Sequence, residues 1–285
     1  MKKIIFSNNG IKNNIYVVLF VVFLIGLIAS FGMMGYNAWL GNKAQQNFEN
    51  LLGTETENET ETIVESETEE TETEVDILTE RGITIPEKNL VWGDLYKTNE
   101  HIYAWIYVPN TSVDYPVLQH PTDDIYYLRH NLDGSAGHPG CIYSEHKYNG
   151  KDWTDFNTLL FGHNLDNGLM FTSLHKFEDS TFFEENRYVY IYTPEHVYVY
   201  DIFGAYVYGD THILAQYNSQ SESRRQDYLD VVFDIRDMSA HFRKDVEVTT
   251  ESNLLTLVTC INGRPDNRYI VQGVLINPPV VDEAE

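Results

Sequence analysis

The chain has 285 residues and a formal net charge of −24, from 19 basic and 43 acidic side chains. This length allows one sizeable domain with appendages, and the acidic balance excludes a nucleic-acid-binding surface, which needs clustered cations. Two cysteines, Cys141 and Cys260, are too few for a disulfide framework, although a single bridge between them stays open. No Cys-x-x-Cys pair and no His/Cys cluster has zinc-ligand spacing, so we expect neither a metal nor a cofactor.

An uncharged apolar segment near the N-terminus predicts a membrane anchor. Lysines precede it, and no charged residue lies between Ile15 and Asn42. Roughly 20 apolar residues suffice to cross the ~30 Å hydrocarbon core, and Tyr36 and Trp39 suit the interface that follows. We predict a cytoplasmic N-terminus over residues 1–14, a single-pass anchor over 15–36 and an extracellular remainder. A cleaved signal peptide is the alternative, but the segment is long for one and lacks an obvious cleavage site.

The next segment, residues 37–76, is predicted to be an acidic extracellular linker. Twelve acidic residues and no Lys or Arg lie between Thr54 and Glu80, interspersed with threonine. Such a sequence cannot bury a core and repels itself, so we expect a disordered tether over most of its length. A short helix could precede it, over residues 42–52.

Folded sequence is expected from Ile77 onward, so residues 77–285 form the predicted catalytic domain. Short apolar runs bounded by turn residues predict a mostly β fold, a closed barrel of about eight strands. A short helix is expected before it, at Leu90–Tyr96. Helical inserts are predicted at Met170–Lys176 and at Glu222–Phe242, and the second of these could form a wall of the site. The predicted strands are Tyr103–Val108, Val113–Leu118, Cys141–Tyr143, Thr158–Phe161, Tyr188–Tyr192, Val197–Tyr208, Leu254–Cys260 and Tyr269–Ile276.

The cysteine strand and its neighbour carry the first candidate site residues. The run Leu254–Cys260 ends on a thiol, the loop Ile261–Asn267 follows, and the next strand begins on Arg268. Cysteine and arginine would therefore lie at the same end of adjacent strands. A free thiol is more often a small buried hydrophobe than a nucleophile. Reactivity needs a base or a cation that stabilises the thiolate.

His163 is the candidate base. It follows the apolar strand that ends at Phe161, and Gly162 before it removes a side chain where another segment would approach closely. A polar loop comes next. We expect the remaining histidines to be surface or packing residues.

These motifs, in this order, resemble those of the sortases. The run Thr256–Cys260 resembles the Thr-Leu-x-Thr-Cys signature of that family, Phe161–Asn164 resembles its Gly-His motif, and Arg268–Val271 resembles its arginine-led last strand. The resemblance covers about Ile77–Asn277 and is to class B in particular. The further segments that are similar to class B are Ala104–Ile106, Asp114–Gln119, Tyr126–Leu128, Asn167–Phe171, Phe182–Phe183 and Ile191–Pro194.

The resemblance implies a cysteine transpeptidase of the Gram-positive cell surface. Cys260 would be the nucleophile, His163 the general acid/base, and Arg268 the cation that positions the substrate or the oxyanion. Such an enzyme, a thiol peptidase-like acyl transferase of the EC 3.4.22 type, would cleave a surface protein after Thr in an Asn-Pro-x-Thr-like sorting signal. It would form a thioester and pass the protein to an amine of a lipid II-like peptidoglycan precursor. The resemblance implies no cofactor.

Competing assignments concern single residues and the reaction. Arg264 is also near Cys260, but it lies in the predicted loop. Cys141 superficially resembles the cysteine of L,D-transpeptidases, whose His-Gly-Cys-Ile-Arg signature is broken here by Pro139 and by Tyr143 in place of the arginine. We therefore expect Cys141 to be structural. The reaction could also be that of a pilin-polymerising sortase, or the domain could bind peptides without catalysing any reaction.

Overall fold

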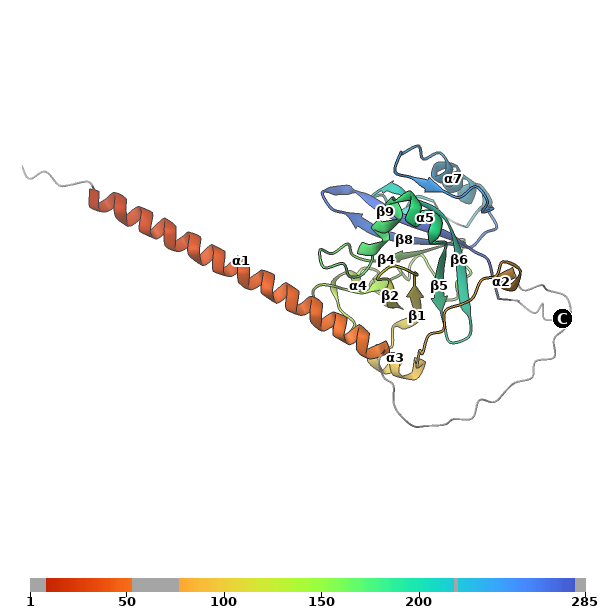
Figure 1. Cartoon of the computed structure of the whole chain (residues 1–285), viewed down its shortest axis with the longest axis horizontal. Helices are drawn as coiled ribbons and strands as arrows, with labels where there is room; N and C mark the ends of the chain where they lie inside the picture. The colour runs from red at the N-terminus through yellow and green to blue at the C-terminus, as the bar shows by residue number, and fades with distance from the viewer. Residues whose placement is uncertain (1–8, 53–76, 218–219, 280–285) are drawn as a thin grey trace, which may run out of the picture.

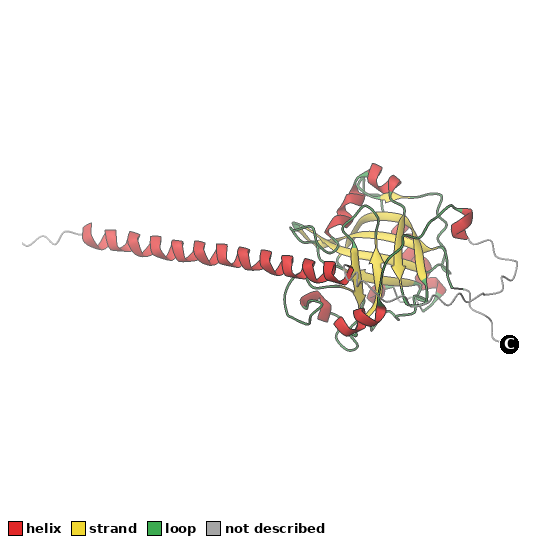
Figure 2. Ribbon diagram, turned by 60° about the horizontal axis from the view of Figure 1, so that its bottom comes forward, coloured by secondary structure: helices red, strands yellow, loops and turns green. Residues whose placement is uncertain are grey.

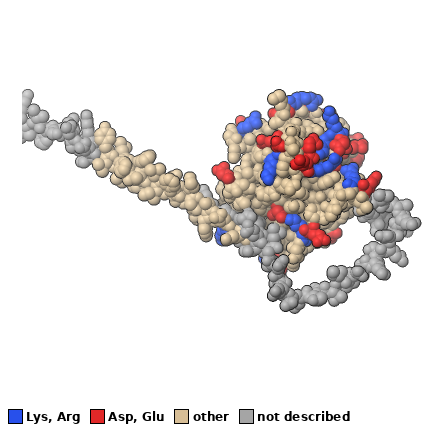
Figure 3. Space-filling view, in the orientation of Figure 1, with Lys and Arg blue, Asp and Glu red and all other residues tan. Residues whose placement is uncertain are grey.

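The N-terminal segment is one long helix, α1 (Asn9–Leu52), in a computed structural model that describes residues 9–52, 77–217 and 220–279 (Figure 1). Its stretch Tyr16–Tyr36 has a mean hydropathy of 2.8 and no buried part. Figure 3 shows few charged side chains along the helix, in contrast to the mixed charges on the folded domain. The helix is thus long and apolar enough to cross a membrane, by length and composition.

The helix extends past the predicted end of the anchor. Residues 37–52, which we assigned to the linker, continue α1 without a break, and only the part from 42 onward was expected to be helical. Good helix formers such as Ala, Leu and Gln are frequent in this stretch, which contains no Pro, and both features favour continuation of the helix. The Thr/Glu-rich run at 54–74 lies outside the described residues. The folded domain is described from α2 (Ile77–Glu80) onward.

A single sheet forms the body of the domain (Figure 2). Its order is β5-β1-β2-β3-β4-β8-β9-β6-β7, and β5 also pairs with β6. That extra pairing closes a ring of eight strands and leaves β7 outside it on β6, which confirms the predicted barrel. The strands are β1 (Ile102–Tyr107), β2 (Asp114–Leu118), β3 (Ile142–Tyr143), β4 (Asn157–Phe161), β5 (Tyr188–Tyr192), β6 (Val197–Gly209), β7 (His241–Phe242), β8 (Leu254–Ile261) and β9 (Arg264–Leu275).

Two pairings bring the predicted site together. Strands β4 and β8 run parallel, with Phe161 opposite Val258, so both strands end at the same edge of the barrel. Strands β8 and β9 are antiparallel, so β9 begins where β8 ends. The chain must cross over between parallel partners, and here residues 162–253 lie between β4 and β8. Residues about 100 positions apart thus meet at one rim.

Helices lie around the barrel, and one of them differs from the prediction. The expected helix Glu222–Phe242 ends at Phe233, and its last residues form β7 on β6 instead. Asp237 accepts hydrogen bonds from the backbone N–H and hydroxyl of Ser239, a local turn that competes with helix. The helical segments after α2 are α3 (Trp92–Thr98), α4 (Tyr126–Arg129), the 3₁₀ helix η1 (Thr172–Glu178), α5 (Ser180–Glu185), α6 (Ile213–Gln216) and α7 (Glu222–Phe233).

Two apolar clusters hold the domain together. The larger one fills the barrel and includes Trp105, Tyr200 and Phe171. The second packs Tyr228 and neighbouring side chains of α7 against the outer face of β6, β8 and β9. The packed parts of these strands are therefore buried on both faces, which explains why apolar residues predominate on both faces there. A strand packed on both faces is a rigid support for the residue at its end.

Candidate active site

Cys260 lies at the rim of the barrel, one residue before β8 ends. The residues from Leu254 to Thr259 are buried, whereas Cys260 is exposed. Thr259 fixes this end of the strand, because its hydroxyl donates to the Gly162 carbonyl over 2.8 Å. The thiol is thus accessible to solvent and is carried by a strand that cannot move freely.

Arg268 stands directly opposite Cys260 in the β8–β9 register. Side chains of such a cross-strand pair emerge on the same face of a sheet. The Nη1 of Arg268 donates to the carbonyls of Pro265 and Asn267. Among the described residues Arg268 forms no salt bridge, so its charge is not neutralised by a carboxylate there.

The strand that carries Arg268 starts earlier than we predicted. Arg264 pairs with Ile261, so the expected loop Ile261–Asn267 is reduced to the turn Asn262–Gly263. A glycine suits the second position of this two-residue turn because that position has a positive φ, which is 76° at Gly263. Arg264 is exposed and does not line the pocket that contains Cys260. The geometry therefore favours Arg268 as the site cation.

His163 follows β4 and lies in a mostly buried position. Its Nε2 lies 2.8 Å from the carbonyl oxygen of Leu128. Because a carbonyl only accepts, Nε2 carries a proton, and in the neutral ring Nδ1 is the nitrogen with a lone pair. Burial lowers the pKa of His163, the hydrogen bond to Leu128 opposes that shift, and the nearby His138 lowers the pKa further.

Gly162 allows this histidine to sit where it does. A methyl group at Gly162 would lie 2.6 Å from Ile142 Cδ1 and 2.7 Å from the ring of Phe171. Real Cβ atoms do not approach so closely, so any larger residue would push the loop away from the barrel. The close approach expected from the sequence is confirmed.

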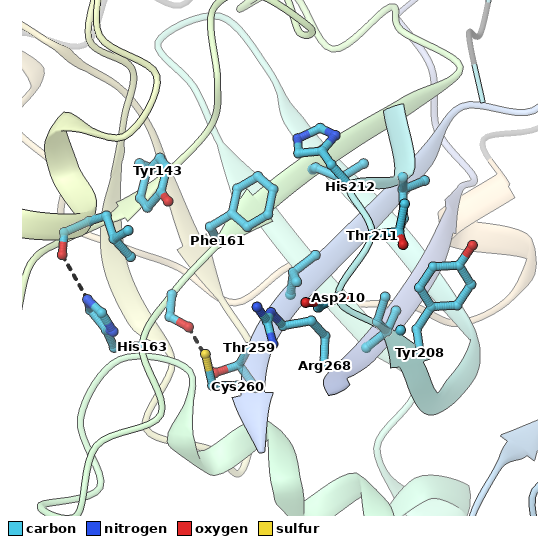
Figure 4. Close-up of a pocket in the computed structure, with 17 residues that line it drawn as sticks. Tyr143, Phe161, His163, Tyr208, Asp210, Thr211, His212, Thr259, Cys260 and Arg268 are labelled. Atoms are coloured by element: carbon cyan, nitrogen blue, oxygen red, sulfur yellow. Dashed lines mark hydrogen bonds between the residues drawn. The ribbon is translucent and has the colours of Figure 1, made fainter. Parts of the chain in front are cut away.

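One pocket of about 260 Å³ brings the three predicted site residues together. Cys260 lies between the side chains of His163 and Arg268 in Figure 4. A thiol, an imidazole and a guanidinium on one cavity are the groups that acyl transfer by a cysteine nucleophile requires. The remaining lining residues are mainly apolar and aromatic, namely Leu128, Tyr143, Leu159, Phe161, Gly162, Tyr208, Gly209, Asp210, Thr211, His212, Ile213, Thr259, Val258 and Ile270.

The wall of the pocket is not the one we predicted. No residue of α7 lines it; the segment Tyr208–Ile213, between β6 and α6, does so instead. Helix α7 packs behind that segment, on the outer face of the sheet. Within the segment, His212 lies with Nε2 2.6 Å from a carboxylate oxygen of the largely buried Glu145. The sequence offered no motif for His212, so only the fold could place it at the pocket.

Cys141 is remote from this chemistry. It is buried, does not line the pocket, and its thiol lies 3.6 Å from the carbonyl oxygen of His130. Burial raises the pKa of Cys141 far above the ordinary value of a thiol, which suppresses the thiolate. Both cysteines are free, so the bridge between them that the composition left open is absent from the described structure.

Comparisons with known proteins identify the family of the chain. The sortase domain family matches residues 106–276. Sortase B of Listeria monocytogenes is 28% identical over 185 residues, which cover 64% of this chain and 73% of that protein. Sortase B of Staphylococcus aureus is 29% identical over 170 residues, covering 58% of this chain and 66% of the relative.

Solved structures give the same result. The X-ray structure of Clostridium perfringens sortase B superposes with a TM-score of 0.58 at 26% identity, covering 65% of this chain and 99% of that one. A Staphylococcus aureus sortase B–substrate complex gives a TM-score of 0.55 at 25% identity, covering 66% and 85%. A family match over more than half of the chain, the barrel and the cysteine pocket lead to one conclusion. The chain belongs to the sortase family of cysteine transpeptidases, and within it to class B.

Proposed function

We propose that Cys260, His163 and Arg268 cleave an Asn-Pro-x-Thr-like sorting signal after Thr and transfer the protein to an amine of a peptidoglycan precursor. The observation that carries this proposal is the in-register pairing of Cys260 with Arg268 on a pocket that His163 also lines. The Staphylococcus aureus relative has been solved as a substrate complex, which supports a peptide substrate for this pocket as well. The sorting motif and the acceptor are those that the resemblance to class B implies.

In the first half of the reaction the Cys260 thiolate attacks the carbonyl carbon of the signal's Thr. A C–S bond forms and the carbonyl electrons move onto oxygen, where donors from Arg268 stabilise the negative charge. Because burial lowers the pKa of His163, its ring is largely neutral at pH 7 and can take the proton of the thiol. The imidazolium then protonates the leaving amine as the C–N bond breaks, and a thioester remains.

In the second half an amine resolves the thioester. His163 takes a proton from the attacking amine, the new amide bond forms, and Cys260 leaves as a thiolate. Cys260 is exposed, so an amine and water can both reach the thioester. An amine bound beside the thioester has a higher effective concentration at the carbonyl carbon, and transfer then competes with hydrolysis.

The rest of the chain would hold this chemistry outside the cell. Residues 1–14 would stay in the cytoplasm, because lysines precede the apolar span. Within α1, residues 15–36 would cross the membrane once, and residues 37–76 would tether the catalytic domain, 77–285, on the outer face. The proposed location is the cell membrane of a Gram-positive bacterium.

The test uses the full chain in detergent micelles and a library of Asn-Pro-x-Thr peptides. Wild-type protein and Cys141→Ala should cleave after Thr and form a thioester adduct visible by mass spectrometry. Cys260→Ala should form no adduct, and His163→Ala should lower kcat by about 10³-fold, as removal of a general acid/base does. Adduct formation by Cys260→Ala but not by Cys141→Ala would refute the assignment.

The same experiment distinguishes wall anchoring from the competing functions. With a peptidoglycan precursor and a lysine-bearing pilin-like peptide offered together, mass spectrometry of the product identifies the amine that was joined. A product linked to the lysine side chain would indicate a pilin-polymerising sortase. Peptide binding without any turnover by the wild-type protein would indicate a binding module.

A further inference from the structure

The main-chain carbonyl of Cys260 is held by two side chains from outside its own sheet. Asn164 Nδ2 and His175 Nε2 each lie 3.0 Å from the carbonyl oxygen of Cys260. Asn164 belongs to the loop after β4, and His175 lies on η1. Neither side chain lines the pocket, so neither is placed to touch a substrate there. Two separate segments therefore converge on the backbone of the proposed nucleophile.

His175 is itself fixed in place. Its Nδ1 lies 2.6 Å from a carboxylate oxygen of Glu178, one turn later on η1. Its ring stacks on Tyr269, with centroids 4.9 Å apart and planes 23° apart. Tyr269 is fully buried and follows Arg268 in β9. The imidazole is thus oriented by a carboxylate at one edge and by a rigid aromatic face, and it presents its other edge to Cys260.

Hydrogen positions follow from what each partner can donate. The Glu178 carboxylate only accepts, so Nδ1 of His175 carries a proton. Asn164 Nδ2 lies 3.0 Å from His175 Nε2 as well as from the Cys260 carbonyl. In the neutral ring Nε2 accepts one hydrogen of the Asn164 amide, and the other hydrogen goes to the carbonyl. In the protonated ring Nε2 donates to the carbonyl directly. In both forms the carbonyl of Cys260 retains a donor.

The position of this carbonyl explains why it needs such a hold. The β8–β9 register shifts between Cys260 and Ile261, so the regular ladder is interrupted directly after the cysteine. An irregularity of this kind re-aims a side chain and leaves the backbone less constrained by pairing. The two hydrogen bonds to the Cys260 carbonyl constrain the backbone where the strand pairing does not. The Cys260 side chain and its carbonyl are both attached to Cα, so the orientation of the carbonyl affects the direction of the thiol.

We propose that Asn164 and His175 are positioning residues that clamp the Cys260 carbonyl and so aim its thiol at the scissile bond, with Glu178 orienting His175. The inference rests on the proposed role of Cys260 as nucleophile. It assigns a role to His175, which carries no motif, and to two further polar residues, Asn164 and Glu178, none of which lines the pocket. In this proposal only Cys260, His163 and Arg268 contact the reacting atoms of the substrate.

The test compares Asn164→Ala, His175→Ala and His175→Gln in the full chain in detergent micelles. With an Asn-Pro-x-Thr peptide, each alanine variant should lower kcat by about 10-fold while KM stays within about twofold, because a small misplacement of a catalytic group mainly reduces the chemical step. His175→Gln offers an amide donor to the same carbonyl and should recover most of the loss. The matched control is His146→Ala, which removes a similar histidine–carboxylate pair, with Asp124 at 2.5 Å, that does not touch Cys260.

A second readout needs no substrate. The chain has two cysteines, so carbonyl-¹³C cysteine labelling gives two carbonyl resonances, which Cys141→Ala assigns. Loss of the amide donor in Asn164→Ala, and loss of the ring that orients this amide in His175→Ala, should each move the Cys260 resonance upfield and leave that of Cys141 in place. An unmoved Cys260 resonance would overturn the clamp. So would a shifted resonance with unchanged kcat, or a His175→Gln variant as slow as His175→Ala.

The two proposals fail in different ways. If the wild-type protein cleaves no peptide, the proposed function is refuted, and the ¹³C shift still reports whether the clamp exists. If the wild type cleaves and the clamp variants cleave equally well, the positioning role alone is refuted. Glu178→Gln tests the positioning role if an alanine variant does not fold, because it is a conservative change at a half-exposed side chain. This variant should lower kcat about threefold, because it weakens the charge-assisted hydrogen bond between residue 178 and His175.

Discussion

Cys141 and Cys260 occupy two regions of one barrel and have opposite surroundings. Each lies next to the boundary of a strand, Cys141 just before β3 and Cys260 near the end of β8. Cys141 faces the core, where burial raises its pKa, and its thiol contacts a backbone carbonyl. Cys260 is exposed on the rim opposite Arg268. The same side chain is thus a packing residue in one place and a candidate nucleophile in the other.

Proximity in sequence to a histidine does not decide which thiol is reactive. His138 is three residues before Cys141, yet its ring packs against His163 with centroids 5.0 Å apart. The two histidines that share a pocket with Cys260 lie far from it in the chain, His163 before β5 and His212 after β6. The fold, and not local sequence, brings the thiol, the imidazoles and the guanidinium together. The reactivity of a thiol therefore depends on the groups that the fold places around it.

The contrast between the two thiols predicts the largest effect. In the native protein iodoacetamide should alkylate Cys260 about 10³-fold faster than Cys141, because a buried thiol reacts only when the core opens locally at a cost of several kcal/mol. Peptide mass spectrometry at successive times measures both rates. In urea the two thiols should react at similar rates, which serves as the control. Comparable alkylation rates in the native state would show that Cys141 is accessible and would contradict the contrast between a buried and an exposed thiol.

The two arginines near the rim allow a second comparison. Arg268→Ala should lower kcat by about 10²- to 10³-fold, as does removal of a donor to a developing oxyanion. Arg264→Ala should leave kcat within about twofold, because Arg264 is exposed and lies outside the pocket. Arg268→Lys should recover only part of the loss, since an ammonium cannot reproduce the fork of guanidinium donors. Equal losses in the two alanine variants would mean that the site cation was misassigned.

Much of this arrangement was predictable because it depends on regular elements. Apolar runs with turn residues predicted the eight barrel strands. His163 and Cys260 near the ends of β4 and β8 share one pocket with Arg268, although β9 begins four residues before Arg268. A strand buried on both faces has a strong sequence pattern. A residue at its end can therefore be located without knowledge of the rest of the fold.

The failures occurred where local and long-range preferences compete. The helix expected to reach Phe242 ends at Phe233, because Asp237 and Ser239 form a local turn and β7 gains pairing on β6. The pocket wall at His212 and the contact of His175 with Cys260 join segments from distant parts of the chain. No spacing in the sequence encodes such contacts, since a lone histidine has the same appearance in a core, on a surface or behind a nucleophile.

The smallest predicted effect concerns the histidine beside His163. His138→Phe keeps an aromatic ring against His163 and removes a like charge, so it should raise the pKa of His163 toward the ordinary histidine value. Burial, the larger cause of the lowered pKa, is unchanged in the variant, so the shift should be only partial.

The same pKa affects stability. The pKa of His163 is lower in the folded state than in the unfolded state, so the unfolded state binds the proton first as the pH falls below about 6.5. The protein therefore loses stability as the pH falls from there through the folded pKa. In His138→Phe the folded and unfolded pKa values of His163 lie closer together, so the protein should lose less stability through this group on acidification.

Titration of the His163 ring resonances by NMR measures the pKa shift. The control is His196→Phe, because His196 bonds to the Asn277 carbonyl instead and its replacement should leave the His163 pKa unchanged. An unchanged or lowered His163 pKa in His138→Phe would contradict electrostatic coupling between the two rings.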